Sequence, residues 1–250
     1  MSSTLGVFRA EFEGSNDIGV FARLTNKYCL VAQSNSENFY SVFEEKLADH
    51  VPVIHATIGG NKIVGRLCVG NSNGLILPNS CSDQELQYLR DCLPDEIAVV
   101  RVDDRLSALG NTIACNDHVA LIHPEIDPTT EEIIADVLGV EVFRQTIGNN
   151  PLVGACAAFT NVGGLVPPMT SIEEQDELAT LMQIPIAHGT VNRGSDVLGG
   201  GLVVNDWVGY VGRHTTGPEI NVVESIFGLN TEETTGLIGE DAKHAFIETL

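Results

Sequence analysis

The chain has 250 residues, of which 43% are hydrophobic, and its 34 acidic and 13 basic side chains give a net charge of −21. The apolar content is enough for a continuous core, whereas the negative charge opposes close approach to phosphate backbones and anionic lipid. The sequence has no signal peptide and no apolar run long enough to span a bilayer, so we expect neither secretion nor membrane insertion.

The first apolar stretch, residues 5–12, is typical of a strand but has no partner in the sequence beside it. Beyond it, a short turn sequence recurs along the chain. Its asparagines are Asn26, Asn71, Asn116, Asn161 and Asn205, which are separated by 45, 45, 45 and 44 residues. A constant period of this length indicates a repeat architecture. Because five copies occupy most of the chain, we expect one closed domain.

Each repeat has the same predicted order of elements. An apolar run opened by glycine precedes the asparagine and a second apolar run follows it, which favours a β-hairpin. A helix follows, marked by a capping box in which Ser or Thr precedes Glu by three residues. The boxes are Ser34/Glu37, Ser82/Glu85, Thr129/Glu132, Ser171/Glu174 and Thr216/Glu219. A β-branched run completes the unit, so the repeat is strand, strand, helix, strand (ββαβ).

The fifth copy lacks its third strand, because the residues after its helix are too polar. We therefore predict that residues 5–12 supply that strand and close the ring, which removes an exposed sheet edge. Residues 1–228 would form this single ring domain. Residues 229–250 are acidic and Thr-rich, and we expect a mobile tail there.

The sequence gives little indication of catalysis. Cys115, Asp117 and His118 lie close together, but they belong to the repeated turn, so we interpret Cys115 as structural. The spacing of the histidines does not favour a metal site. The six cysteines form no CxxC pair, and we expect them to be reduced and without a catalytic role. We expect no metal and no cofactor.

The connections between repeats are more informative. They cover residues 14–18, 59–66, 103–111, 148–154 and 192–199. If rotation about one axis relates the repeats, all five connections emerge on one face of the ring. Arg66, Arg101, Arg105 and Arg193 lie in or beside them, so we expect this face to be less acidic than the rest.

Long stretches of the chain resemble the eukaryotic translation initiation factor 6 family. They are IGVF (18–21), LTNKYCLVA (24–32), SENFYS (36–41), RLSALGN (105–111), DVLGVEVFRQ (136–145) and GTVNRGS (189–195). The resemblance covers essentially all of residues 12–228. It implies an α/β pentein fold, which is a five-fold pseudosymmetric ring of ββαβ units.

The resemblance also implies a non-catalytic factor that binds the intersubunit face of the large ribosomal subunit. Such a factor blocks joining of the small subunit and takes part in nucleolar and cytoplasmic maturation of the large subunit. The implied partners are ribosomal proteins and rRNA near the sarcin-ricin loop, and a GTPase with its cofactor for release. We expect a monomer found in the cytoplasm and in the nucleus and nucleolus.

We predict that the ribosome-binding face contains residues from the connections and their neighbours. They are Arg66, Asn71, Arg105, Leu109, Asn111, Arg193 and Val197. Two alternatives remain open. Other penteins are enzymes that modify guanidino substrates through a cysteine near the C-terminus, but the last cysteine here is Cys156. A general protein-interaction ring without a ribosomal partner is the third interpretation.

Overall fold

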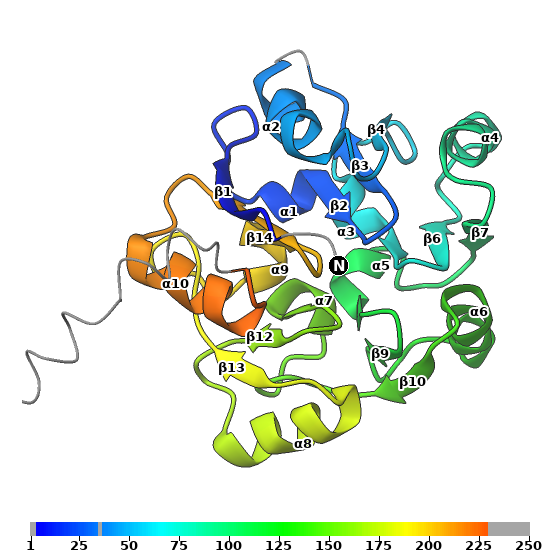
Figure 1. The fold of residues 1–250 in the computed structure, drawn as a ribbon. Coiled ribbons are helices and arrows are strands. Elements are labelled where there is room, and N and C mark those ends of the chain that lie inside the picture. Colours follow the sequence, from blue (N-terminus) through cyan, green and yellow to red (C-terminus); the bar gives the residue numbers. More distant parts are fainter. Residues whose placement is uncertain (1–3, 35–36, 230–250) are drawn as a thin grey trace, which may run out of the picture.

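The computed structural model describes residues 4–34 and 37–229. Within them, five three-stranded sheets surround one axis, and a longer helix lies outside each sheet (Figure 1). A four-residue helix precedes the first strand of every sheet and lies near the axis. In four sheets both hairpin and third strand come from one repeat. In all five the first two strands are antiparallel and the third is parallel to the second.

The elements follow the repeats in chain order after β1 (Gly6–Ala10). Repeat one contains α1 (Ile18–Phe21), β2 (Ala22–Leu24), β3 (Cys29–Ala32), α2 (Glu37–Leu47) and β4 (Val53–Ala56). Repeat two contains α3 (Val64–Leu67), β5 (Val69–Gly70), β6 (Gly74–Pro78), α4 (Asp83–Cys92) and β7 (Ala98–Val102). Repeat three contains α5 (Leu109–Thr112), β8 (Ile113–Cys115), β9 (Val119–Ile122), α6 (Pro128–Leu138) and β10 (Glu141–Arg144). Repeat four contains α7 (Val153–Cys156), β11 (Ala158–Phe159), β12 (Gly164–Val166), α8 (Ile172–Met182) and β13 (Ile186–His188). Repeat five contains α9 (Leu198–Gly201), β14 (Leu202–Val204), β15 (Val208–Gly212) and α10 (Gly217–Ile226).

The N-terminal strand closes the ring, as predicted. β1 pairs in parallel with β15, with Gly6 opposite Val208 and Ala10 opposite Gly212. It therefore occupies the place of the missing third strand in the fifth sheet. Leu229 is fully buried, and residues 230–250, which include most of the predicted acidic tail, lie outside the described part. The division at residue 228 stays a prediction.

The outer helices bury one apolar stripe each. In α2, Phe39, Phe43 and Leu47 are fully or almost fully buried, and their spacing of four residues places them on one face of the helix. Burying a large apolar side chain stabilises the fold by about 1.5–3 kcal/mol. None of the helices in residues 4–34 and 37–229 is long and apolar enough to cross a bilayer.

Two of the predicted capping boxes are present as expected. Ser82 caps α4 and exchanges hydrogen bonds with Glu85. At α10, the carboxylate of Glu219 accepts from the amide and the hydroxyl of Thr216. The Ser34/Glu37 pair depends on a side chain outside the described part.

The other two boxes differ from the prediction. Ser171 caps α8 through the amide of Glu174, but the Glu174 carboxylate turns away and accepts from the amide of Gly148. The box at Thr129 and Glu132 is wrong, because α6 begins earlier, with Asp127 as N-cap and proline in the first turn. Asp and Pro are a strong pair of N-terminal signals, and they override the later threonine.

The repeated asparagines are not all equivalent. In each hairpin one amide bonds the carbonyl three residues later and closes the turn. The residues at this position are Thr25, Asn71, Asn116, Thr160 and Asn205. Asn26 and Asn161 therefore lie one position later in their turns than Asn71, Asn116 and Asn205 do, although the sequence analysis treated all five as equivalent. Threonine replaces asparagine because its hydroxyl also accepts from the turn amides two and three residues on.

The predicted first strands begin later than expected. Their opening glycines lie in the four-residue helices, and the strands start about three residues further on. The glycines are Gly19, Gly65, Gly110, Gly154 and Gly199. At each of them, an added Cβ would overlap the carbonyl oxygen of the corresponding glycine in the preceding repeat. The five form a closed ring of backbone contacts around the axis, and only glycine permits an approach this close.

A methyl group in this ring should therefore be costly. We expect Gly154→Ala to lower the free energy of unfolding by about 3 kcal/mol or to prevent folding, because two backbone carbonyls crowd the new Cβ. Urea denaturation measures the change. Gly217→Ala is the matched control, since no atom lies within 4 Å of a Cβ there, and it should change stability by less than about 0.5 kcal/mol. Equal stability of the two variants would contradict the role of the glycine ring.

Candidate interaction face and axial channel

The connections between repeats share one design at four of the five places. A tight turn joins Phe12 to Ser15, and the same bridge recurs at Ile58–Asn61, Ile147–Asn150 and Val191–Ser195. The connection of repeat three has no such bridge and instead bonds the Leu106 amide to the Asp104 carboxylate at 2.7 Å. The face that carries the connections is therefore nearly symmetric, with one sector that differs.

Glutamates of the outer helices hold three of these turns, and Glu174 of α8 does so through the Gly148 amide. The Glu85 carboxylate accepts from the amides of Gly59 and Gly60, both at 2.9 Å, and from the Thr57 hydroxyl at 2.8 Å. Partial burial raises the pKa of Glu85, but these hydrogen bonds and those from Ser82 outweigh burial and lower the pKa to about 2. Glu219 holds the turn at Arg193 in the same way.

An apolar crown lies on this face around the axis. It consists of the residues that directly precede α3, α7 and α9, which are Ile63, Leu152 and Val197. Their exposed fractions are 40%, 39% and 48%. The equivalent residues of the other two repeats are Asp17 and Ala108. Large apolar side chains exposed at symmetric positions on a strongly acidic chain mark a surface suited to protein contact.

Three of the seven predicted face residues are exposed here. Val197 belongs to the crown, Arg193 lies in a turn with φ 65°, and Arg105 pairs with Glu125 at 2.7 Å. Asn111 is half-buried in α5. Leu109 is fully buried, so its side chain cannot contact a partner directly.

Arg66 does not point outward. Its Nε donates to the Gly19 carbonyl at 3.1 Å and its Nη1 to the Gly154 carbonyl at 2.9 Å. Gly199 lies beside it, because a Cβ there would meet Nη1 at 3.0 Å. The side chain therefore crosses the axis from repeat two and contacts repeats one, four and five. Its placement on the face was wrong for this reason.

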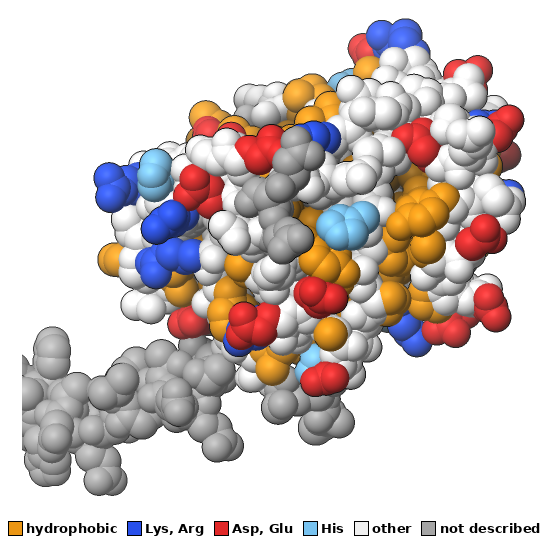
Figure 2. Space-filling model, turned by 90° about the horizontal axis from the view of Figure 1, so that it is seen from above, with side chains coloured by type: hydrophobic (Ala, Val, Ile, Leu, Met, Phe, Trp, Pro, Cys, Tyr) orange, Lys and Arg blue, Asp and Glu red, His pale blue; other side chains and the backbone are white. Residues whose placement is uncertain are grey.

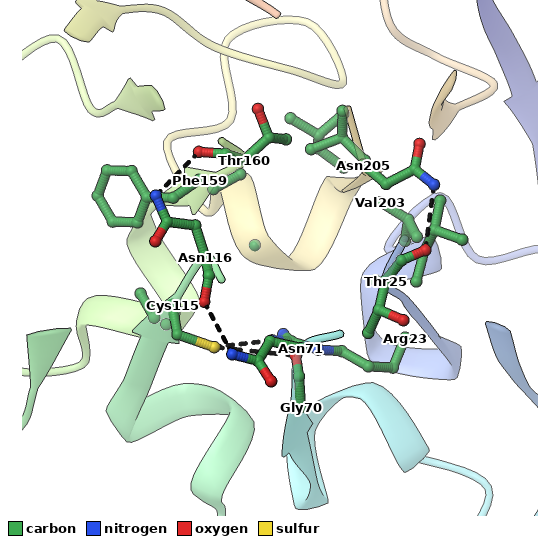
Figure 3. Close-up of a pocket in the computed structure, with 18 of the residues that line it drawn as sticks. Arg23, Thr25, Gly70, Asn71, Cys115, Asn116, Phe159, Thr160, Val203 and Asn205 are labelled. Carbon is green, nitrogen blue, oxygen red and sulfur yellow. Dashed lines mark hydrogen bonds between the residues drawn. The ribbon is translucent and has the colours of Figure 1, made fainter. Parts of the chain in front are cut away.

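Asn71 was also misplaced. It is 3% exposed and lies at the opposite end of β5 from the connection. Its Nδ2 donates to the carbonyls of Asn116 and Leu138, at 3.2 and 2.8 Å. In the same way, Nδ2 of Asn116 donates to the Thr160 carbonyl and Nδ2 of Asn205 donates to the Thr25 carbonyl (Figure 3). These amides join neighbouring repeats at the far end of the axial channel.

A further set of hydrogen bonds between repeats, the outer belt, involves the residues one position later in each turn. The amides of Ser72, Asp117, Asn161 and Asp206 each donate to the side-chain oxygen of the next repeat. The Nδ2 groups of Asn26 and Asn161 each bridge the two carboxylates. Burial raises the pKa of Asp117, but hydrogen bonds from Asn161 and Ser72 and then from Asn26 lower it below its ordinary value.

The channel contains a cysteine whose thiol is not activated. Cys115 lines it, and its Sγ is 3.7 Å from Nη2 of Arg23. Burial raises the pKa of the Cys115 thiol despite this arginine, and it raises the pKa of Cys68 and of Cys156 to about 11. Catalytic thiols need a lowered pKa. In the described residues, no group of three or more His, Cys, Asp or Glu side chains could hold a metal ion.

Sequence reasoning missed Arg23 as a channel residue. The equivalent residues of the other first strands are Val69, Ala114, Ala158 and Val203, so an arginine interrupts an otherwise apolar position. This departure from the repeat pattern could have identified Arg23 from the sequence. Asp117 and Asp206 were also visible as acids beside the repeated asparagine.

A closed ring of five ββαβ units about one axis places this chain among the pentein-fold proteins. The model of the eIF-6 family matches residues 7–226, and the chain belongs to that family. Its relatives include proteins named eukaryotic translation initiation factor 6. The Drosophila melanogaster protein is 62% identical over 89% of this chain and 91% of its own length, and the Schizosaccharomyces pombe protein is 60% identical over 92% and 94%.

Solved structures show a more distant similarity. A dimethylarginine dimethylaminohydrolase adduct with S-methyl-L-thiocitrulline aligns over 69% of this chain and 68% of its own, with a TM-score of 0.46 and 11% identity. The N-terminal domain of the arginine dihydrolase ArgZ aligns over the same shares, with a TM-score of 0.46 and 12% identity. At this level the similarity supports no functional argument.

The arginine that crosses the axis should stabilise the ring. We expect Arg66→Met to lower the free energy of unfolding by about 2–4 kcal/mol, because two buried carbonyls lose a charged donor. Arg105→Met is the control, since its ion pair is exposed and should contribute less than about 1 kcal/mol. Urea unfolding of both variants measures the difference, and a smaller effect at Arg66 than at Arg105 would exclude the structural role.

The Glu85 carboxylate should make stability depend on pH. Because its pKa is lowered on folding, its contribution is complete above about pH 4.5 and is lost as the pH falls towards 2. Glu85→Gln should lower the free energy of unfolding by about 1 kcal/mol at pH 7, because solvent screens this partly exposed carboxylate. Near pH 2 the substitution should not change the free energy of unfolding. Urea unfolding from pH 7 to 3 measures this, with the exposed Glu96→Gln as control. Parallel pH profiles of the wild type and Glu85→Gln would refute it.

Proposed function

We propose that this chain binds the large ribosomal subunit at its intersubunit face and prevents premature joining of the small subunit. Family membership and the names of the relatives support a role in translation initiation. A rigid ring closed by β1 can act by occupying space. This action needs a complementary surface and no chemical turnover, and the raised thiol pKa values agree with a non-catalytic protein.

The observation that carries this proposal is the apolar crown of Ile63, Leu152 and Val197. Partly exposed apolar side chains in the middle of a face serve as anchors in protein interfaces, while surrounding polar groups exclude water. Arg193 and Arg105 lie on the same face. The partners on the ribosome would be ribosomal proteins at the crown and, beside the arginines, rRNA phosphates near the sarcin-ricin loop.

Charge supports basic ribosomal proteins as the main partner. Figure 2 shows acidic side chains spread over one side of the ring, with apolar side chains exposed between them. Of the four arginines expected on the face, Arg101 and Arg105 pair with carboxylates and Arg66 lies inside the channel. Among the described residues, Arg193 makes no ion pair within 4 Å, so a local phosphate contact would fall to it.

The wider role follows from the same activity. A protein that blocks subunit joining acts during late maturation of the large subunit, and we place it in the nucleolus, the nucleus and the cytoplasm. Its removal would require work, which a GTPase with its cofactor would supply. The ring would act as a monomer, because a second copy on the crown would cover the binding face.

Substitutions in the crown test this proposal. Val197→Glu and Leu152→Glu should each reduce pelleting with purified large subunits at least tenfold and restore subunit joining, because a charge replaces an apolar anchor. The matched control is Val162→Glu. Val162 is 41% exposed but lies in the hairpin turn at the opposite end of β11, so this variant should bind like the wild type.

The result that would refute the face is binding by both crown variants at wild-type strength with subunit joining still blocked. Arg66→Glu is unsuitable for this purpose, because it would break the axial contacts and confuse folding with binding. Incubation with arginine derivatives tests the enzyme alternative, and formation of citrulline would contradict the non-catalytic role.

A further inference from the structure

Two arginines from neighbouring repeats line the axial channel. Arg23 comes from β2 and Arg66 from α3. In the part of the chain that the structure describes, neither has a carboxylate within 4 Å. Their hydrogen bonds go to neutral groups, which are the carbonyls of Gly19, Gly70 and Gly154 and the Cys115 thiol. The channel therefore holds two positive charges that no described carboxylate contacts directly.

The two cations act on each other. Burial lowers the pKa of the Arg66 guanidinium, and the nearby charge of Arg23 lowers it further, to about 9. The folded ring therefore contains an unfavourable interaction between two like charges. A negative ion close to both would relieve it.

Arg23 also has an unused donor. Its Nη2 bonds the Gly70 carbonyl at 3.0 Å, whereas its buried Nε has no hydrogen-bond partner. Figure 3 shows the side chain extending into the channel towards Gly70 and Cys115. A buried N–H without an acceptor is costly and points to a group that could accept from it.

The acids of the channel do not fill this role. Asp117 and Asp206 lie in the outer belt, where their oxygens accept from Asn26, Ser72 and Asn161. Negative charge therefore lies at the end of the channel that carries the hairpin turns. Arg66 lies at the glycine ring, and Arg23 lies between the two, at Gly70 and Cys115. This arrangement favours an anion of low charge, because a multiply charged one would be repelled more strongly by the two carboxylates.

We propose that the axial channel binds one small monovalent inorganic anion, of the size of chloride, between Arg23 and Arg66. The channel has a volume of about 80 Å³, several times the roughly 10–15 Å³ that one buried water requires. It holds such an ion with a few waters. The ion accepts from Nε of Arg23 and from the guanidinium of Arg66, and it stabilises the ring from within.

Chloride-dependent unfolding of the full chain tests this site. Thermal unfolding is followed while chloride replaces gluconate from 1 to 300 mM at constant ionic strength and neutral pH. We expect the Tm of the wild type to rise by about 4 °C with chloride, because the ion binds the folded state. Arg23→Met should abolish this rise, whereas Arg105→Met, a surface arginine, should keep it.

A crystal of the wild type soaked in bromide gives an answer that needs no variant. We expect an anomalous peak in the channel beside both guanidinium groups. A channel that contains only water would overturn the proposal. So would a wild-type Tm that is equal in chloride and gluconate, or an Arg23→Met variant that folds and retains the full chloride dependence.

Discussion

Contact between backbones at the axis is the constraint on which the rest of the structure depends. Five helical turns meet there, and each brings a glycine against a carbonyl oxygen of the previous repeat. A side chain at any of these positions would push the repeats apart and open the sheets. Arg66 spans the same centre and ties the turns together through two carbonyls. The centre therefore fixes the angle between neighbouring repeats.

The two ends of the ring serve different purposes. At one end, carboxylates of Glu85 and Glu219 hold the connecting turns in place, and the apolar crown lies exposed on a rigid support. At the other end, amides and carboxylates bond one repeat to the next and leave few groups for a partner. Residues of a binding interface must be fixed in position by the rest of the fold, and their side chains must stay free to contact a partner. This difference supports the proposal that the ribosomal contact lies at the connections, and it explains why the most regular residues of the sequence are structural.

Much of the fold was predictable because its signals are local. Capping at Ser82 and Thr216, the hairpin turns and the apolar stripe of α2 depend on residues within one repeat. Because the repeats recur at a constant spacing, the same elements could be predicted in all five of them. The polar segment after α10 indicated that β1 closes the ring. The candidate face was predicted less well. Val197, Arg193 and Arg105 are exposed as expected, but Leu109 is buried and Asn71 lies at the other end of its strand.

The sequence by itself determined the number of repeats, their order of elements, the closing strand and the family, since periodicity, capping and long matching segments are properties of the chain alone. Only the tertiary structure decided which side chains face outward. Arg66 and Asn111 occupy equivalent positions, yet the longer side chain reaches across the axis to repeats one and four. Such contacts join residues 47 and 88 positions apart, and no local pattern encodes a direction that depends on how five repeats meet.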